Sequence, residues 1–340
     1  MKVEKAGSVR VDLVGGTLDI EPIHLILPNV VTLNVATGLM AKVTVEARED
    51  DKIVIFSEDY QKTYNYDLSD FTQKNLYQNN YFDEMTFICQ LIALFQLDQG
   101  LDIKLSSNAP AGSGLGGSSS MGVVFYEALS ELVGRKTDPK STVRMVKATE
   151  GRILNQGMPG YQDYFPALLG GVLALKAKTG DIEIEQLYTS ELKAFLESHI
   201  TLVYSGLSRS SGINNWSVYK AFFDKDENVR SAMERIAELS HQTYQAIQKS
   251  DFPEILKFIH QEGETRKKLA PTIVPREVDE IFNVLKEEFN DLGIKMCGAG
   301  GGGCFILVHN AQDKSKLQDR IAKTPMKVLD FKIESPKINI

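Results

Sequence analysis

A glycine- and serine-rich run near the middle of the chain, residues 110–121, constrains its fold and chemistry more than any other segment. It reads P-A-G-S-G-L-G-G-S-S-S-M, with an alternating apolar segment before it (101–105) and a helical pattern after it (122–133). Glycines let a backbone turn its N–H groups toward a ligand, and the N-terminus of a following helix adds partial positive charge. The run therefore predicts a cradle for phosphate and indicates nucleotide chemistry.

Two other interpretations of the run stay open when only its residues are considered. Glycine–serine runs are often flexible linkers, but this one contains Leu115 and Met121 and is flanked directly by a strand and a helix pattern. Gly112, Gly114 and Gly117 also satisfy the G-x-G-x-x-G spacing of dinucleotide-binding loops, although no short-loop strand–helix–strand start surrounds them. The Walker pattern is excluded, because no lysine follows the run at the required offset.

Composition and charge narrow the class of protein. The 340 residues suffice for two domains or one large one, and the net charge of −7 argues against a general nucleic-acid binder. The three cysteines form no C-x-x-C pair and the five histidines have no ligand spacing, so we expect neither a disulfide framework nor structural zinc. The sequence shows neither the apolar core of a signal peptide nor an apolar stretch long enough to span a bilayer. We therefore expect a soluble cytoplasmic protein without a membrane or nucleic-acid partner.

Alternating and helical apolar patterns predict strands mixed with long helices, without regular strand–helix alternation, which favours an α+β fold. We expect strands at residues 8–14, 30–37, 39–47, 53–57, 101–106, 172–176, 199–204, 294–297, 304–309 and 327–333. We expect helices at residues 84–96, 118–132, 141–154 (capped by Ser141), 228–249, 253–269, 276–290 and 311–322. Residues 58–80 are polar and predict irregular structure, while 179–181 predict a turn at a domain boundary.

A second glycine cluster, G-A-G-G-G-G at residues 298–303, separates two predicted strands. A hairpin turn needs one or two glycines, so five indicate that the backbone passes very close to another group or adopts positive φ repeatedly. The other group can be a second stretch of backbone. Because the chain also carries a phosphate-type loop, a ligand is the preferred interpretation.

Taken together, segments in a fixed order make the chain resemble the GHMP small-molecule kinases, the family of galactokinase, homoserine kinase, mevalonate kinase and phosphomevalonate kinase. The first family motif is similar to R-V-D-L-V-G-G-T-L-D at residues 10–19. The second, P-x-x-x-G-L-G-S-S, is similar to residues 110–118, with Gly117 in place of the first serine. The third, G-x-G-G-G-G, matches residues 298–303.

A fourth segment brings the chain near the sugar kinases of this family. Glu150, then G-Y-Q-D-Y at residues 160–164 and the glycine pair 170–171, is similar to their pattern E…G-x-Q-D-Q-Y…G-G. Residues 15–19 and the segment Y-S-G-L-S-R-S-S at 204–211 resemble the heptose and sugar-1-phosphate kinase branch. Galactokinase is the next nearest branch. The chain departs from the heptose and sugar-1-phosphate kinase branch just after Asp19, where the family builds its sugar pocket.

The resemblance implies a fold of two domains. The N-terminal domain would be like ribosomal protein S5, the C-terminal domain would be ferredoxin-like, and the site would lie in the cleft between them. We expect residues 1–182 to carry the first two motifs and the ATP site, and residues 183–340 to carry the third motif.

The reaction implied is transfer of the ATP γ-phosphoryl group to a hydroxyl of a sugar or sugar phosphate, with Mg²⁺. Ser118 and Glu150 would bind the metal, since Mg²⁺ takes few protein oxygens beside phosphate and water. The residues expected to bind the phosphates are Pro110, Gly112, Ser113, Gly114, Leu115, Gly116, Gly117, Ser118 and Ser119.

The resemblance also assigns roles in catalysis and acceptor binding. Asp163 would accept the proton of the acceptor hydroxyl, and Arg10 would keep that carboxylate charged and neutralise charge on the transferred group. The residues expected to bind the acceptor are Gly16, Thr17, Asp19, Gly160, Arg209, Gly300 and Gly301. Two other readings remain open: a mevalonate-type alcohol as acceptor, and a non-catalytic member that only binds ligand. The sequence assigns neither an oligomeric state nor a lid role to residues 58–81.

Overall fold

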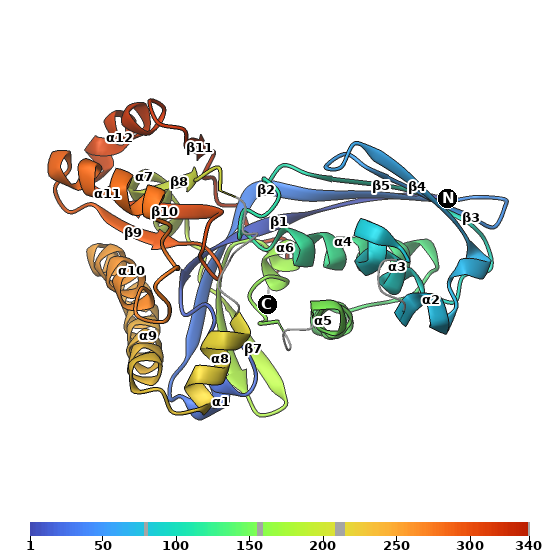
Figure 1. Ribbon diagram of the computed structural model, residues 1–340, viewed down its shortest axis with the longest axis horizontal. Helices are drawn as coiled ribbons and strands as arrows, with labels where there is room; N and C mark the ends of the chain where they lie inside the picture. The colour runs from blue at the N-terminus through green and yellow to red at the C-terminus, as the bar shows by residue number, and fades with distance from the viewer. Residues whose placement is uncertain (78–80, 155–158, 208–214, 339–340) are drawn as a thin grey trace.

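Two β-sheets, formed by the first and the second half of the chain, organise the protein (Figure 1). The computed structural model describes residues 1–77, 81–154, 159–207 and 215–338. Within these residues no helix is long and apolar enough to cross a membrane.

The first sheet has the strand order β4-β3-β5-β2-β6-β7, with β1 paired to β2. The long strand β2 is its spine: residues 31–35 pair with β6, residues 41–47 pair with β5, and β1 follows it antiparallel along most of its length. The strands are β1 (Lys2–Val14), β2 (Val31–Ala47), β3 (Lys52–Ser57), β4 (Lys62–Asp67), β5 (Leu101–Ser107), β6 (Val172–Lys178) and β7 (Asp181–Gln186).

Most helices of the first half lie along one face of this sheet, whereas the short α1 (Ile23–Ile26) lies apart from them, near α8 (Asn215–Phe223) (Figure 1). Phe125 of α4 and Ile103 of β5 belong to the same buried apolar cluster, which joins helices and sheet. The second half of β2 therefore alternates between buried and more exposed residues, as a strand covered on one face should. The helices are α1 (Ile23–Ile26), α2 (Gln73–Tyr77), α3 (Thr86–Ile92), α4 (Gly117–Leu132), α5 (Pro139–Leu154) and α6 (Phe165–Leu169).

The second sheet is antiparallel, with the order β11-β8-β10-β9. Helices connect β8 to β9 and β10 to β11, so the order is that of a ferredoxin-like split βαβ arrangement. The strands are β8 (Ile200–Tyr204), β9 (Gly293–Met296), β10 (Cys304–Val308) and β11 (Lys327–Leu329). The helices are α7 (Ser190–His199), α8 (Asn215–Phe223), α9 (Glu227–Gln248), α10 (Phe252–Arg266), α11 (Arg276–Glu288) and α12 (Lys314–Ile321).

Helices α9 and α10 connect the two halves, because both contact β1 of the first sheet. Apolar residues of α9 recur at helical spacing, with Val229, Met233 and Ile236 all buried. In its last turns Ser240 Oγ accepts the backbone N–H of Val31 at 3.3 Å. This contact helps explain why the first residues of β2, unlike its second half, are buried on both faces.

Several predicted elements differ from those observed. The strands predicted at 30–37 and 39–47 form one continuous strand, because Gly38 keeps the extended path of β2. The polar stretch 58–80 was predicted to be irregular, yet it contains β4, which pairs with β3, and α2. Helix α5 begins before Ser141, and the Asp138 carboxylate accepts the Ser141 backbone N–H at 3.0 Å, so Asp138 provides the cap.

The expected domain boundary after residue 182 falls inside β7. Strands β6 and β7 pair antiparallel in the first sheet, and Gly180, with φ 76°, turns the chain between them. The turn predicted at 179–181 is therefore present, as a hairpin within the first sheet. The first sheet extends to Gln186, and α7 is the next element.

Candidate active site

A cavity of about 830 Å³ opens between the two halves of the chain. This volume lies within the range of pockets that hold nucleotides and other small ligands. Residues of the loop after β1, the glycine–serine run, the turn before α6, helix α8 and the second glycine cluster line it. Most of the predicted phosphate-binding residues are among them, namely Pro110, Gly112, Ser113, Gly114, Gly116, Gly117, Ser118 and Ser119.

The glycine–serine run has the geometry of an anion cradle. Gly112, Gly114 and Gly116 have φ of 68°, 76° and 74°, a region that glycine adopts without strain. Helix α4 begins at Gly117, so the N–H groups of its first turn have no acceptor within the helix. A Cβ at Gly117 would meet nothing within 4 Å, which leaves open space in front of the helix N-terminus.

Leu115 does not line the cavity, although it lies in the middle of the run. Its side chain is buried in an apolar cluster, and its carbonyl accepts the backbone N–H of Arg10 at 3.0 Å. Leu115 therefore anchors the run against β1 instead of contacting a ligand with its side chain.

The second glycine cluster packs on the backbone of the first run. A Cβ at Gly298 would lie 2.8 Å from the Gly114 carbonyl oxygen, and one at Gly303 would lie 2.5 Å from that of Ser113. The Ser113 carbonyl also accepts the Cys304 backbone N–H at 2.6 Å. The preference for a ligand as the cause of this glycine excess is therefore corrected: the neighbour is another backbone.

The same packing changes the assignment of two predicted acceptor residues. Gly301 donates its N–H to the carbonyl of Ile273 at 2.8 Å, and a Cβ at Gly300 would lie 2.7 Å from that same oxygen. Neither glycine lines the cavity, whereas their neighbours Gly298 and Ala299 do.

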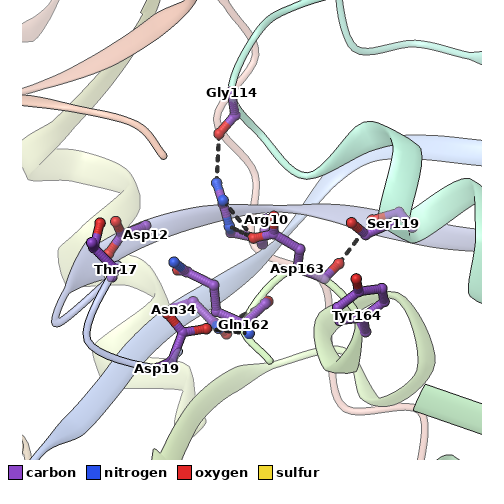
Figure 2. Close-up of polar contacts among 12 residues, drawn as sticks. Arg10, Asp12, Thr17, Asp19, Asn34, Gly114, Ser119, Gln162, Asp163 and Tyr164 are labelled. Carbon is purple, nitrogen blue, oxygen red and sulfur yellow. Dashed lines mark hydrogen bonds and ion pairs between the residues drawn. The ribbon is translucent and has the colours of Figure 1, made fainter. Parts of the chain in front are cut away.

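Arg10 and Asp163 form an ion pair at the cavity (Figure 2). Nε of Arg10 donates to Oδ1 of Asp163 at 2.8 Å, and Nη2 lies 2.5 Å from the same oxygen. Nη1 donates to the Gly114 carbonyl at 2.6 Å. Burial disfavours the charged guanidinium, but the Asp163 and Asp12 carboxylates outweigh it and raise the pKa of Arg10. The expected pairing of Arg10 with Asp163 is thus present in the geometry.

Glu150 of α5 faces the first turn of α4. Its Oε2 accepts the Ser119 hydroxyl at 2.8 Å and the Tyr164 hydroxyl at 2.7 Å. Burial raises the pKa of Glu150, against the opposing effect of the hydroxyls, among them Ser118. Tyr164 stands where the sugar-kinase pattern has its second glutamine. Its hydroxyl holds the Glu150 carboxylate in place by this hydrogen bond.

The donor groups at this end of the cavity fit a magnesium ion. Ser118 and Glu150 both line the cavity and both offer oxygen, the ligand atom that Mg²⁺ prefers. Among the described residues no three His, Cys, Asp or Glu side chains gather as a metal cage. A site with few protein ligands suits an ion that is bound largely through phosphates and water.

Thr17, Asp19 and Gly160 also line the cavity, and Thr17 and Asp19 lie on the opposite side of Asp163 from Ser119 (Figure 2). Asp19 is buried, and its Oδ2 accepts the Gln162 backbone N–H at 2.8 Å (Figure 2). Burial raises the pKa of Asp19 to about 6. A side chain at position 160 would displace the Asp19 carboxylate, because a Cβ there would lie 2.1 Å from Asp19 Oδ2.

Two further predicted acceptor residues lie elsewhere or outside the described residues. Gly16 does not line the cavity, and a Cβ there would lie 2.2 Å from Oδ2 of Asp12. Arg209 lies outside the residues that the structure describes.

Sequence reasoning missed the aromatic side chains of α8. The rings of Trp216 and Tyr219 stack with centroids 5.8 Å apart, and both side chains line the cavity. The Tyr219 hydroxyl donates to the Glu21 carbonyl, and the Tyr161 hydroxyl donates to the Glu21 carboxylate. The spacing of three residues between the two aromatics was the available indication of a helix here.

Comparison with known proteins now identifies the class that the fold and the site define. The model of the GHMP kinases N terminal domain matches residues 80–171, and that of the GHMP kinases C terminal matches residues 243–327. The chain belongs to the GHMP kinase family, as its motifs predicted.

Its relatives act on different acceptors. The chain is 24% identical to D-glycero-alpha-D-manno-heptose 7-phosphate kinase of Campylobacter jejuni over 95% of this chain and 94% of that protein. It is 22% identical to the mevalonate kinase of Methanocaldococcus jannaschii over 91% of this chain and 95% of that protein. It is 26% identical to the bifunctional fucokinase/GDP-fucose pyrophosphorylase of Arabidopsis thaliana over 69% of this chain, a match that spans 23% of that longer protein.

Solved structures establish the fold. A D-glycero-D-manno-heptose 1-phosphate kinase from Bacteroides thetaiotaomicron superimposes with a TM-score of 0.76 at 21% identity, covering 99% of this chain and 97% of that one. The galactokinase of Lactococcus lactis, complexed with galactose, superimposes with a TM-score of 0.77 at 15% identity, covering 98% of this chain and 94% of that one. The expected two-domain architecture is confirmed.

Proposed function

We propose that this protein is an ATP-dependent kinase that transfers the γ-phosphoryl group to a hydroxyl of a sugar or sugar phosphate. The observation that carries the proposal is the Arg10–Asp163 ion pair beside the phosphate cradle. In this proposal Arg10, which also donates to the Gly114 carbonyl, would hold the Asp163 carboxylate where an acceptor hydroxyl and a transferred phosphoryl group can meet.

The glycine–serine run is the donor site in this proposal. The free N–H groups at the start of α4 and the left-handed glycines before it would surround the triphosphate of ATP. Ser118 and Glu150 would hold Mg²⁺, which, when bound, neutralises charge on the phosphates.

Asp163 is the catalytic carboxylate in this proposal. It would orient the acceptor hydroxyl and accept its proton as the bond to phosphorus forms. Arg10 restrains Asp163 and would stabilise the negative charge that develops on the transferred group. Because phosphoryl transfer depends mainly on alignment and charge placement, a restrained pair of this kind is what the reaction requires.

A sugar suits the acceptor end of the cavity. Asp19 offers a buried carboxylate and Thr17 a side-chain hydroxyl, both of which can hydrogen-bond to sugar hydroxyls. Trp216 and Tyr219 provide aromatic faces at the same end. The similarity to the heptose 7-phosphate kinase over nearly the whole of both chains supports this class of acceptor.

A mevalonate-type alcohol is the second candidate acceptor. The observation that favours it is the similarity to the mevalonate kinase of Methanocaldococcus jannaschii, which also spans nearly the whole of both chains. The same donor site would serve either acceptor.

A single assay tests the proposal. Purified protein with Mg-ATP is offered galactose, L-fucose, D-glycero-D-manno-heptose 7-phosphate and mevalonate, and ADP release is measured. We expect release with one of the three sugars. Release with mevalonate alone would favour the second candidate. ATP binding without release for any of the four would contradict the assignment of these acceptors.

A further inference from the structure

Four buried charges join the two halves of the chain beside the acceptor end of the cavity. They are Asp12 of β1, Glu262 and Arg266 of α10, and Lys295 of β9, and their side chains are at most 1% exposed. Lys295 Nζ lies 2.9 Å from Asp12 Oδ2, and Arg266 Nη2 lies 2.5 Å from Glu262 Oε1. Two cations and two anions balance, as buried charges must if each is to avoid a large desolvation cost.

Arg266 makes two hydrogen bonds that the charge balance does not require. Its Nη1 donates to the Thr17 hydroxyl at 2.9 Å, and its Nη2 donates to the Gly16 carbonyl at 2.8 Å. Both acceptors belong to the turn that follows β1. A helix of the second half therefore holds the first sequence motif through a fork of two donors.

The turn held by Arg266 has an unfavourable backbone conformation. Thr17 has φ 73°, in the left-handed region that β-branched residues rarely adopt. Such a conformation persists only when the surrounding structure imposes it, and it is common where binding residues are positioned. Arg266 bonds to the Thr17 side chain and to the carbonyl just before it, so it is placed to impose that conformation.

The direction of the turn decides where the acceptor residues lie. Thr17 and Asp19 line the cavity, while Gly16 between β1 and Thr17 packs against Asp12. Asp19 then reaches the Gln162 backbone N–H. A turn released from Arg266 would lose the geometry that directs both Thr17 and Asp19 at an acceptor.

We propose that Arg266 is a positioning residue for the acceptor, and that it acts through Gly16 and Thr17. This inference rests on the proposed function, because it assumes that the acceptor binds at Thr17 and Asp19. The hydrogen bonds of Arg266 go to Glu262 and to the turn, so the glycine–serine run that would bind ATP is not its target.

The test uses one substitution at each end of the contact and one control. Arg266→Lys keeps a positive charge beside Glu262, but a single ammonium cannot reproduce the guanidinium fork. Thr17→Val removes the hydroxyl and leaves all four buried charges in place. Ile259→Val is the control. Ile259 is a fully buried residue of the same helix, so shortening its side chain lowers stability. Its apolar cluster contains no residue of the turn.

Three readouts separate positioning from stability. Amide hydrogen exchange followed by mass spectrometry reports on residues 15–20 and, as an internal reference, residues 110–119. Calorimetry gives the Kd for ATP. Steady-state kinetics gives kcat and KM for whichever of galactose, L-fucose, D-glycero-D-manno-heptose 7-phosphate and mevalonate the unmodified protein phosphorylates.

We expect Arg266→Lys to speed exchange in residues 15–20 and to raise the acceptor KM at least tenfold, with exchange in 110–119 and the Kd for ATP unchanged. Thr17→Val should loosen the same segment, and the double variant should be no worse than the more affected single variant, since Thr17→Val removes one of the two contacts that Arg266→Lys disrupts. Ile259→Val should lower the melting temperature and leave exchange in residues 15–20 and the acceptor KM unchanged.

If Arg266→Lys behaved like Ile259→Val, Arg266 would be merely structural and the inference would be overturned. If Arg266→Lys did not fold, the exchange of residues 15–20 in Thr17→Val would decide, and unchanged protection there would overturn it equally. Absence of turnover with every acceptor would count against the proposed function, whereas the exchange data would still judge the role of Arg266.

Discussion

Nε of Arg10 donates to Oδ1 of Asp163 at 2.8 Å, although 153 positions separate the two residues in the chain. The same guanidinium donates to the Gly114 carbonyl, so one side chain on β1 fixes both the glycine–serine run and the turn that carries Asp163. Because Arg10 is itself buried, neither partner is held by a freely moving surface chain. Restraint of this kind gives a reacting carboxylate a defined position before substrate arrives.

Substitution of Arg10 by lysine should therefore cost activity out of proportion to the change in charge. An ammonium cannot hold Asp163 and Gly114 with a planar fork, and loss of such an electrostatic donor lowers kcat by about 10²–10³ in other enzymes. The control is Arg48→Lys, because Arg48 pairs with Asp50 and Asp102 away from the cavity. Steady-state kinetics should give near-normal turnover for the control; equal effects on both variants would refute a special role for Arg10.

Gly116→Ala should damage the site through geometry alone. Gly116 has φ 74°, and a Cβ there would lie 3.1 Å from the Cβ of Asp163. The left-handed conformation costs an alanine about 1–2 kcal/mol, and the added methyl group also presses on Asp163, the proposed catalytic residue. We expect a lower melting temperature and a fall in kcat.

The matched control for that substitution is Gly180→Ala. Gly180 has φ 76° in the β6–β7 hairpin, and a Cβ there would meet nothing within 4 Å. It should lose a similar amount of stability and keep its kcat. A normal kcat for Gly116→Ala would show that the contact with Asp163 does not matter.

Asp19→Asn should change how stability depends on pH. The pKa of Asp19 is raised from 3.8 to about 6 by burial, so the folded protein holds a proton that the unfolded chain releases between these values. The contribution of this group to stability is greatest below pH 3.8 and is lost as pH rises through 6. Asparagine keeps an oxygen for the Gln162 N–H and carries no charge.

Denaturant unfolding at pH 4 and pH 8 measures that difference. The free energy of unfolding of Asp19→Asn minus that of the unmodified protein should be larger at pH 8 than at pH 4, by up to about 3 kcal/mol. The same difference between variant and unmodified protein at both pH values would contradict a buried, charge-disfavouring site for Asp19.

The two glycine runs show which features of the site could be predicted from the sequence and which could not. Residues 110–121 were predicted to form a phosphate cradle before a helix, and local rules for glycine and helix termini suffice for that. The cause of the glycines at 298–303 was misjudged, because only the folded chain brings Gly298 against Gly114 and Gly303 against Ser113. No local pattern encodes the approach of two loops that distant in sequence.

The charged residues also divide into those whose role could be predicted from the sequence and those whose role could not. Arg10, Asp163 and Glu150 were identified from motifs, and the structure brings the first two into contact. Glu262 and Arg266, four residues apart on one helix, were not singled out from the sequence, which predicted only that residues 253–269 form a helix. Their burial depends on Asp12 and Lys295 from two other strands, which tertiary packing alone brings together.

The most direct test of the account is the turnover of Asp163→Asn with the acceptor that releases ADP from the unmodified protein, measured beside its Kd for ATP. Asparagine preserves shape and a hydrogen-bond acceptor for Arg10 but cannot accept the hydroxyl proton as a carboxylate does. If Asp163 accepts that proton, kcat should fall by a factor of about 10² or more, with the Kd for ATP essentially unchanged. A kcat near that of the unmodified protein would contradict it.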